Sequence, residues 1–168
     1  MRKALTKLRK KFRRRRYSSS EELEKNNKEK ADRDYLKKLE ELKGKHTKTH
    51  LVVDDIDTNR ETLSYLLHQK RIKTHQASNG AEAVEIFSRY NVNYFDVIWM
   101  DIKMPFMDGI GATTILRQRG YQGIIIMITG YINRETLLKC KLIGADKIYP
   151  KPITKDTVYE MDIFQIYM

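Results

Sequence analysis

Residues 95–109 read FDVIWMDIKMPFMDG. The stretch opens with a short apolar run, Phe95 to Met100, in which the only polar residue is Asp96, and the run ends at Asp101. Such runs, rich in β-branched and aromatic residues, are typical of strands buried on both faces of a parallel sheet. Pro105 and Gly109 then predict a loop before the next helix. We therefore predict a buried strand that brings a carboxylate to the edge of a parallel sheet.

Apolar strands and amphipathic helices alternate on both sides of this stretch. The expected strands are residues 50–53, 72–77, 95–100, 124–128 and 147–149, and the expected helices begin near Thr58, Gly80, Ile110, Arg134 and Thr154. Five strands alternating with five helices predict an α/β fold with a doubly wound parallel sheet. Right-handed crossovers place the C-terminal ends of all strands on one edge.

The charge of the chain divides it into two parts. Residues 1–50 hold 19 Lys and Arg against 8 Asp and Glu, whereas residues 51–168 hold 14 of each kind. The whole formal net charge of +11 therefore lies in the N-terminal part. We predict a charged extension over residues 1–47, disordered or partly helical, and one folded domain over residues 48–168.

The extension itself has two segments. Residues 1–16 contain ten Lys and Arg and no acid, which suits a solvated arm, a nuclear-import or nucleic-acid patch, an anionic membrane contact or an organelle transit peptide. Residues 18–43 mix both signs of charge, and Ser19 and Glu22 form a possible capping box. A charged helical linker is the simplest interpretation of this second segment.

Two features of the sequence bear on where in the cell the protein is located. The single Cys140 cannot form an internal disulfide, which fits a reducing compartment. No apolar run approaches the roughly 18 residues that a transmembrane segment needs. We expect a cytoplasmic protein without a transmembrane segment, with nuclear or organelle targeting by the basic block left open.

Polar residues stand at the ends of the expected strands. They are Asp54, Asp55, Asp101, Thr129 and Lys151. Open parallel sheets bind ligands at the carboxyl ends of their strands, so we expect these side chains to share one crevice. Three carboxylates suit Mg²⁺, and a hydroxyl and an ammonium can bind phosphoryl oxygens.

Asp101 is the best candidate for a nucleophile, because it lies centrally between the acidic pair and the Thr129 and Lys151 pair. A carboxylate that attacks a phosphoryl group forms an aspartyl phosphate. Taken singly, each residue has an ordinary explanation, such as a helix cap for the acidic pair. Their joint occurrence at matching strand ends favours a shared phosphoryl site.

These motifs resemble the receiver domain of response regulators, the phosphoacceptor module of two-component signalling. The matching segments are LVVDD at 51–55, NGAEA at 79–83, MDIKMPFMDG at 100–109, ITG at 128–130 and KP at 151–152. The resemblance covers about two thirds of the chain, and the style of residues 100–109 is similar to receivers of hybrid histidine kinases. It implies a flavodoxin-like (βα)5 fold with strand order 2-1-3-4-5.

The resemblance also implies a role for each site residue. Asp101 would accept a phosphoryl group from a histidine kinase or a histidine phosphotransfer protein. The domain would act as a phosphoacceptor that catalyses its own phosphorylation and dephosphorylation rather than as an enzyme on another substrate. Thr129 would bind the phosphoryl oxygens, and Lys151 would pair with Asp101 and then with its phosphate. The implied Mg²⁺ ligands are Asp54, Asp55, Asp101 and the backbone carbonyl of Lys103.

Three features depart from the family pattern. Ile148 occupies the position of the usual switch aromatic, and Tyr149 follows one residue later. Gly130 replaces the usual alanine after the threonine. We also expect no output domain after the last helix, so that the domain would pass phosphate onward, act by binding a partner, or derive from a hybrid sensor kinase.

Three other functions compete with this interpretation. The segment Asp55-Ile56-Asp57 fits a phosphohydrolase of the haloacid-dehalogenase kind, with Asp55 as the nucleophile, but that class would need an acidic pair after the fourth strand. A pseudo-receiver that binds partners without phosphorylation would predict a broken acidic set, and this set is complete. A nucleic-acid binder would depend on residues 1–16 and would lose affinity with salt.

Overall fold

The computed structural model describes residues 22–38, 40–41 and 48–160. The chain divides into two units between Lys37 and Lys38. In the first unit, residues 22–37 are helical. The predicted basic block at residues 1–16 and the predicted domain boundary after residue 47 both lie outside the described residues, so they stay predictions.

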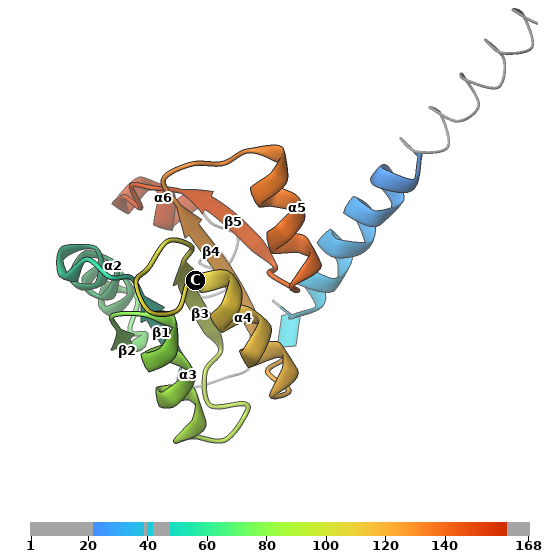
Figure 1. The fold of residues 1–168 in the computed structure, drawn as a ribbon. Helices are drawn as coiled ribbons and strands as arrows, with labels where there is room; N and C mark the ends of the chain where they lie inside the picture. Colours follow the sequence, from blue (N-terminus) through green and yellow to red (C-terminus); the bar gives the residue numbers. More distant parts are fainter. Residues whose placement is uncertain (1–21, 39, 42–47, 161–168) are drawn as a thin grey trace, which may run out of the picture. The chain divides into compact units, whose positions relative to one another are not determined.

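From residue 48 to residue 160, five strands alternate with five helices in the second unit (Figure 1). The strands are β1 (Thr49–Val53), β2 (Lys73–Ala77), β3 (Val97–Asp101), β4 (Ile124–Thr129) and β5 (Lys147–Pro150). The helices are α2 (Asp57–Gln69), α3 (Gly80–Ser88), α4 (Gly109–Gln118), α5 (Arg134–Leu142) and α6 (Lys155–Glu160). All paired strands are parallel, in the order β2-β1-β3-β4-β5. The predicted fold class and strand order are confirmed.

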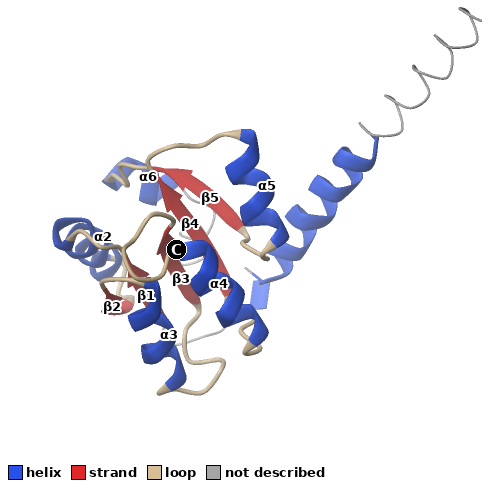
Figure 2. Ribbon diagram, in the orientation of Figure 1, coloured by secondary structure: helices blue, strands red, loops and turns tan. Residues whose placement is uncertain are grey.

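The three central strands β1, β3 and β4 are buried on both faces, which explains their continuous apolar sequences (Figure 2). Side chains alternate between the two faces of a strand. One face, with Leu51, Ile98 and Ile125, packs with buried residues of α3, α4 and α5 in a single cluster. On the other side, Leu63, Leu66 and Leu67 give α2 its buried stripe.

Three strands, β3, β4 and β5, end one residue later than the sequence predicts. Asp101 and Thr129 are themselves the last residues of β3 and β4. Ile128 pairs with Asp101 in the ladder between these strands, and the backbone N–H of Ile102 continues the pairing by donating to the Ile128 carbonyl at 3.0 Å. The backbone of Asp101 is therefore held by the sheet rather than by a loop.

The loop after β3 turns back tightly because of Gly109. The Gly109 N–H donates to the carbonyl of Ile102 at 2.9 Å, and a Cβ at this position would lie 2.1 Å from the carbonyl oxygen of Asp101. Only glycine lets the start of α4 approach the strand end this closely. Asp108 then caps α4, because its side chain accepts a hydrogen bond from Gly111 N–H at 2.7 Å.

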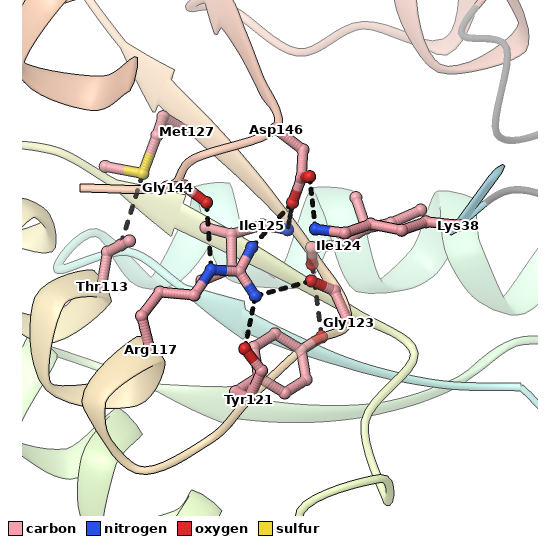
Figure 3. Close-up of polar contacts among 10 residues, drawn as sticks. All are labelled: Lys38, Thr113, Arg117, Tyr121, Gly123, Ile124, Ile125, Met127, Gly144 and Asp146. Atoms are coloured by element: carbon pink, nitrogen blue, oxygen red, sulfur yellow. Dashed lines mark hydrogen bonds and ion pairs between the residues drawn. The ribbon is translucent and has the colours of Figure 1, made fainter. Parts of the chain in front are cut away.

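A cluster of charged side chains lies at the N-terminal edge of the sheet, near the starts of β4 and β5 (Figure 3). We call it the Arg117 cluster, and its charged members are Lys38, Arg117 and Asp146. The Arg117 guanidinium donates to the carbonyls of Tyr121, Gly123 and Gly144 at 2.7–3.0 Å and to Asp146 at 2.8 Å. The Asp146 carboxylate also accepts from the backbone N–H of Ile125 at 2.8 Å and from Lys38 at 2.5 Å. The cluster thus joins the end of α4 to the starts of β4 and β5.

No helix in the described part of the chain is long and apolar enough to cross a membrane.

Candidate functional site

Four of the predicted residues meet at the C-terminal edge of the sheet. We call them the acid cluster: Asp54, Asp55, Asp101 and Lys151. β1 and β3 are neighbours, with Val53 opposite Met100, so the residues that follow or end them lie side by side. Lys151 follows β5, after which the peptide bond to Pro152 is cis. Its Nζ lies 2.7 Å from Asp54 Oδ2 and 2.8 Å from Asp101 Oδ2.

The β1–α2 loop fixes the position of Asp54. One carboxylate oxygen, Oδ1, accepts from the backbone N–H of Ile56 and from the Asn59 side chain, both at 3.0 Å. The other oxygen binds Lys151. Arg60 also reaches back and donates to the backbone carbonyl of Asp54 at 2.6 Å. Asp54 is therefore a buried, fully directed carboxylate, whereas Asp55 beside it is exposed.

The electrostatics of Asp101 distinguish it from an ordinary surface aspartate. Its side chain is only 5% exposed, and burial raises the pKa of its carboxyl group above the usual value. The hydrogen bond and positive charge of Lys151 oppose this shift, while the negative charge of Asp54 adds to it. Burial alone would lower the pKa of Lys151, but its hydrogen bonds and ion pairs with Asp101 and Asp54 raise it. Lys151 is thus held protonated between two carboxylates.

The donor set fits a small divalent cation. Carboxylate oxygens of Asp54, Asp55 and Asp101 all lie within 4.8 Å of one another. Ligands on opposite sides of a Mg²⁺ ion are about 4.2 Å apart, since each Mg²⁺–oxygen bond is about 2.1 Å long. The three carboxylates are therefore near the spacing that one ion requires. Their three negative charges exceed the single positive charge of Lys151, so a bound cation would stabilise the cluster.

Thr129 and Lys103 contribute backbone contacts at this edge of the sheet. The Thr129 carbonyl accepts from the Lys151 N–H at 2.7 Å, which fixes the start of the Lys151 loop. The Thr129 hydroxyl forms hydrogen bonds with the backbone of Tyr131, at 3.2 and 3.3 Å. The backbone N–H of Lys103 interacts with the Asp101 carboxylate and opposes the rise of its pKa. The predicted phosphoryl contact of Thr129 and the metal contact of the Lys103 carbonyl remain predictions.

Strand β5 shows which side chain occupies the position of the usual switch aromatic. Ile148 packs against the core cluster on the α3, α4 and α5 face of the sheet. Successive residues of a strand point to opposite faces, so Tyr149 cannot take the position of Ile148 by a small adjustment. An aliphatic side chain therefore occupies the place where the family pattern has an aromatic.

Sequence reasoning missed two polar residues of the site, Asn59 and Arg60. Both lie in the first turn of α2, where they bind the side chain and the backbone of Asp54. Their signal in the sequence was weak: two long polar side chains in the first turn of a helix that directly follows an acidic pair. Polar side chains in that turn face the carboxyl end of the preceding strand, so they could have been included.

Comparison with known proteins decides the family. Residues 51–161 match the family model described as the response regulator receiver domain. The chain belongs to this family. As a receiver domain, it is similar to the chemotaxis protein CheY of Halobacterium salinarum, with 36% identity over 110 residues that cover 66% of this chain and 89% of that protein. It is also similar to the solved structure of Vibrio cholerae CheY4, with a TM-score of 0.65, 26% identity and coverage of 73% and 99% of the two chains.

Other relatives carry a receiver within a longer chain. The sensor histidine kinase RcsC of Escherichia coli is 32% identical over 108 residues, which cover 64% of this chain but only 11% of the kinase. The regulatory protein AtoC of the same species is 36% identical, and the match covers 22% of its length. The receiver family is therefore shared among small single-domain proteins and large ones, and membership defines the module rather than its output.

Proposed function

We propose that this receiver accepts a phosphoryl group on Asp101 from a phosphohistidine of a partner protein. The observation that carries the proposal is the position of Asp101. It is a buried carboxylate at a strand end, bonded to Lys151 and surrounded by two further carboxylates. The rigid strand backbone aims this oxygen, whereas exposed Asp55 lies in the loop that follows β1.

The chemistry follows from this placement. An Asp101 carboxylate oxygen attacks phosphorus, an oxygen–phosphorus bond forms, the nitrogen–phosphorus bond of the donor breaks, and the released imidazole takes up a proton. Lys151 already donates to Asp101 and can follow the new negative charge onto the phosphoryl oxygens. The raised pKa of Lys151 keeps it cationic throughout the step.

The acid cluster would hold Mg²⁺ through Asp54, Asp55 and Asp101, with the Lys103 carbonyl as a further ligand. When bound, the ion supplies positive charge to the phosphoryl oxygens and relieves the repulsion among the carboxylates. Asp54 contributes most of the fixed geometry, because Ile56 and Asn59 hold one of its oxygens in place.

The surface around the acid cluster suits a protein donor. Ile56, Phe106 and Tyr131 come from three loops at this edge, and they are 51%, 94% and 67% exposed. Phe106 also adopts a positive φ of 63°, which costs a non-glycine residue roughly 1 kcal/mol. Exposed apolar side chains around a polar centre are typical of sites that dock another protein. A histidine kinase or a histidine phosphotransfer protein is the partner that this chemistry requires.

The proposal is tested by incubating the full chain with Mg²⁺ and acetyl phosphate and by recording its intact mass. We expect one phosphoryl adduct that requires Mg²⁺, is absent in Asp101→Asn and persists in the matched variant Asp108→Asn, whose residue caps α4 in the same loop. Absence of an adduct in the wild type, under conditions that label another receiver, would contradict the proposal. An adduct retained by Asp101→Asn would refute the choice of acceptor.

A further inference from the structure

In the described part of the receiver, basic residues gather at the ends of several helices. The helix starts carry both signs of charge, with Asp57 in α2, Glu82 in α3, Asp108 before α4 and Glu135 in α5, but also Arg134 in α5 and Lys155 in α6. Basic residues stand at the ends: Lys70 after α2, Arg89 after α3, Arg119 after α4, and Lys139 and Lys141 in α5. Residues 51–168 carry no formal net charge, so these helix ends form a locally basic edge rather than part of a generally basic domain.

Part of the basic edge forms a continuous surface. We call it the basal patch: Arg71, Lys73, Arg89, Tyr90, Tyr94 and Arg119. Its four cations are exposed and come from the ends of three helices and the start of β2. Lys73 donates to the Tyr94 hydroxyl at 3.4 Å, and Arg119 donates to the Ser88 hydroxyl next to Arg89. These contacts place Lys73 beside the tyrosines and Arg119 beside Arg89, which also pairs with exposed Glu85 at 2.6 Å.

An aromatic platform lies among these cations. The rings of Tyr90 and Tyr94 are stacked, with centroids 4.0 Å apart and an interplanar angle of 11°. Buried Phe95 and half-buried His75 contact both rings edge-on, at 4.9–5.6 Å. These edge contacts hold the two stacked rings in place, while Tyr90 remains 38% exposed. The platform is organised before any ligand binds.

The chain reaches β1 at this same edge. Thr49 begins β1, and its parallel neighbour β2 begins with Lys73 of the basal patch. The residues that precede β1 carry the entire formal excess of positive charge of the sequence. Most of this excess lies in residues 1–16, which residues of both signs separate from β1, so the basal patch is defined by residues of the folded domain alone.

We propose that the basal patch binds single-stranded nucleic acid, with its four cations on backbone phosphates and a base stacked on Tyr90. Nucleic-acid surfaces of this kind combine a basic track with aromatic faces on which unpaired bases stack. A membrane surface fits less well, because amphipathic membrane contacts depend on inserted Trp, Phe or Leu. The exposed large apolar side chains that border this patch among the described residues are Tyr90 and Val92.

The test is a fluorescence anisotropy titration of the full chain with labelled oligothymidylate and oligouridylate at several salt concentrations. We expect Lys73→Glu/Arg89→Glu/Arg119→Glu to bind at least about tenfold more weakly than wild type and to reduce the slope of log affinity against log salt by about 2. The control Arg134→Glu/Lys155→Glu reverses exposed cations at the starts of α5 and α6, at the opposite edge of the sheet, and we expect it to bind like wild type. Tyr90→Ala should weaken binding about tenfold and Tyr90→Phe should restore it.

Three results would overturn the proposal. They are no binding by the wild type, equal losses in the basal and control variants, and wild-type affinity in Tyr90→Ala. Phosphatidylserine vesicles that bind through the same residues and displace the oligonucleotides would assign the patch to a membrane instead. Labelling of each variant by acetyl phosphate reports whether its fold is intact, and it keeps failure here separate from failure of the proposed receiver function.

Discussion

Among its described residues, the receiver has two largely buried clusters of acidic and basic side chains at opposite edges of one sheet, and they are built differently. In the Arg117 cluster, one carboxylate meets two cations and a backbone N–H, and three further guanidinium hydrogens meet carbonyls. In the acid cluster, three carboxylates lie together and one ammonium pairs with two of them, Asp54 and Asp101. The first cluster is satisfied by the fold alone, whereas the second has excess negative charge that a cation or a phosphoryl group can use.

The comparison shows that the residue types do not separate structure from function. Both clusters are built of Asp with Lys or Arg, and both are largely shielded from water. What differs is the balance of charge and its effect on protonation. Burial raises the pKa of Asp101, so its ionised form is less stable than that of an ordinary surface aspartate.

The largest expected effect is loss of stability on breaking the satisfied cluster. Asp146→Ala leaves Arg117, the Ile125 N–H and Lys38 without their acceptor. Removing one partner of a buried ion pair costs about 3–5 kcal/mol. Urea unfolding should show this loss, with exposed Asp156→Ala in α6 changing stability by less than about 0.5 kcal/mol as the control. A loss below about 1 kcal/mol for Asp146→Ala would show that the cluster is not structural.

A second effect comes from His50, which lies in neither cluster. It is fully buried, and burial lowers its pKa from 6.5 to about 3, with a smaller contribution from Lys48. Between these values the unfolded chain binds a proton that the folded chain does not, so stability falls as pH falls below 6.5. Unfolding free energies should drop by about 3 kcal/mol between pH 7 and pH 4, and less steeply in His50→Gln. Parallel slopes for the two proteins would contradict this assignment.

Asp101→Asn should act in the opposite direction to Asp146→Ala. The raised pKa of Asp101 means that its ionised form opposes folding at neutral pH, and the opposition fades as pH falls and the carboxyl group is protonated. The variant should therefore be more stable than wild type by about 1 kcal/mol at pH 7, as is common where function requires a strained site. The difference should shrink in acid. Chemical unfolding of a double variant with His50→Gln separates this trend from the titration of His50.

Lys38→Met should have the smallest effect. Lys38 completes the Arg117 cluster, but its side chain is 26% exposed and Asp146 keeps its bonds to Arg117 and Ile125. Partly exposed ion pairs contribute about 0.5 kcal/mol. Thermal unfolding at low and high salt should show a small, salt-dependent loss. A loss as large as that of Asp146→Ala would mean that Lys38 is as essential to the cluster as its carboxylate.

The sequence predicted the fold well where burial dominates. β1, β3 and β4 are covered on both faces, so their apolar runs were plain, and glycine and asparagine marked the helix boundaries. β2 lies at the edge of the sheet and is mostly polar, and its predicted start at Ile72 was one residue early. The predicted helix starts at Gly80 and Arg134 agree with the structure, since Asn79 and Asn133 cap them.

The sequence predicted which residues form the site but not how their side chains are oriented. Strand ends could be aligned because parallel strands share one edge, so the acid cluster was predictable from spacing. The orientation of the Thr129 hydroxyl toward Tyr131 was not, because it depends on a local turn. The Arg117 cluster gave no signal either: Arg117 and Asp146 are ordinary charged residues 29 positions apart, and only the fold brings the end of α4 to the residues that precede β5.

The most direct test of the account is to identify the phosphorylated side chain. The full chain is labelled with acetyl phosphate and Mg²⁺, the acyl phosphate is reduced with borohydride to homoserine, and peptides are sequenced by mass spectrometry. The account predicts homoserine at residue 101 and aspartate retained at residues 54 and 55. Homoserine at residue 55 would support a haloacid-dehalogenase-like nucleophile instead, and homoserine at neither place would contradict the central claim that the unbalanced acid cluster is a phosphoryl acceptor.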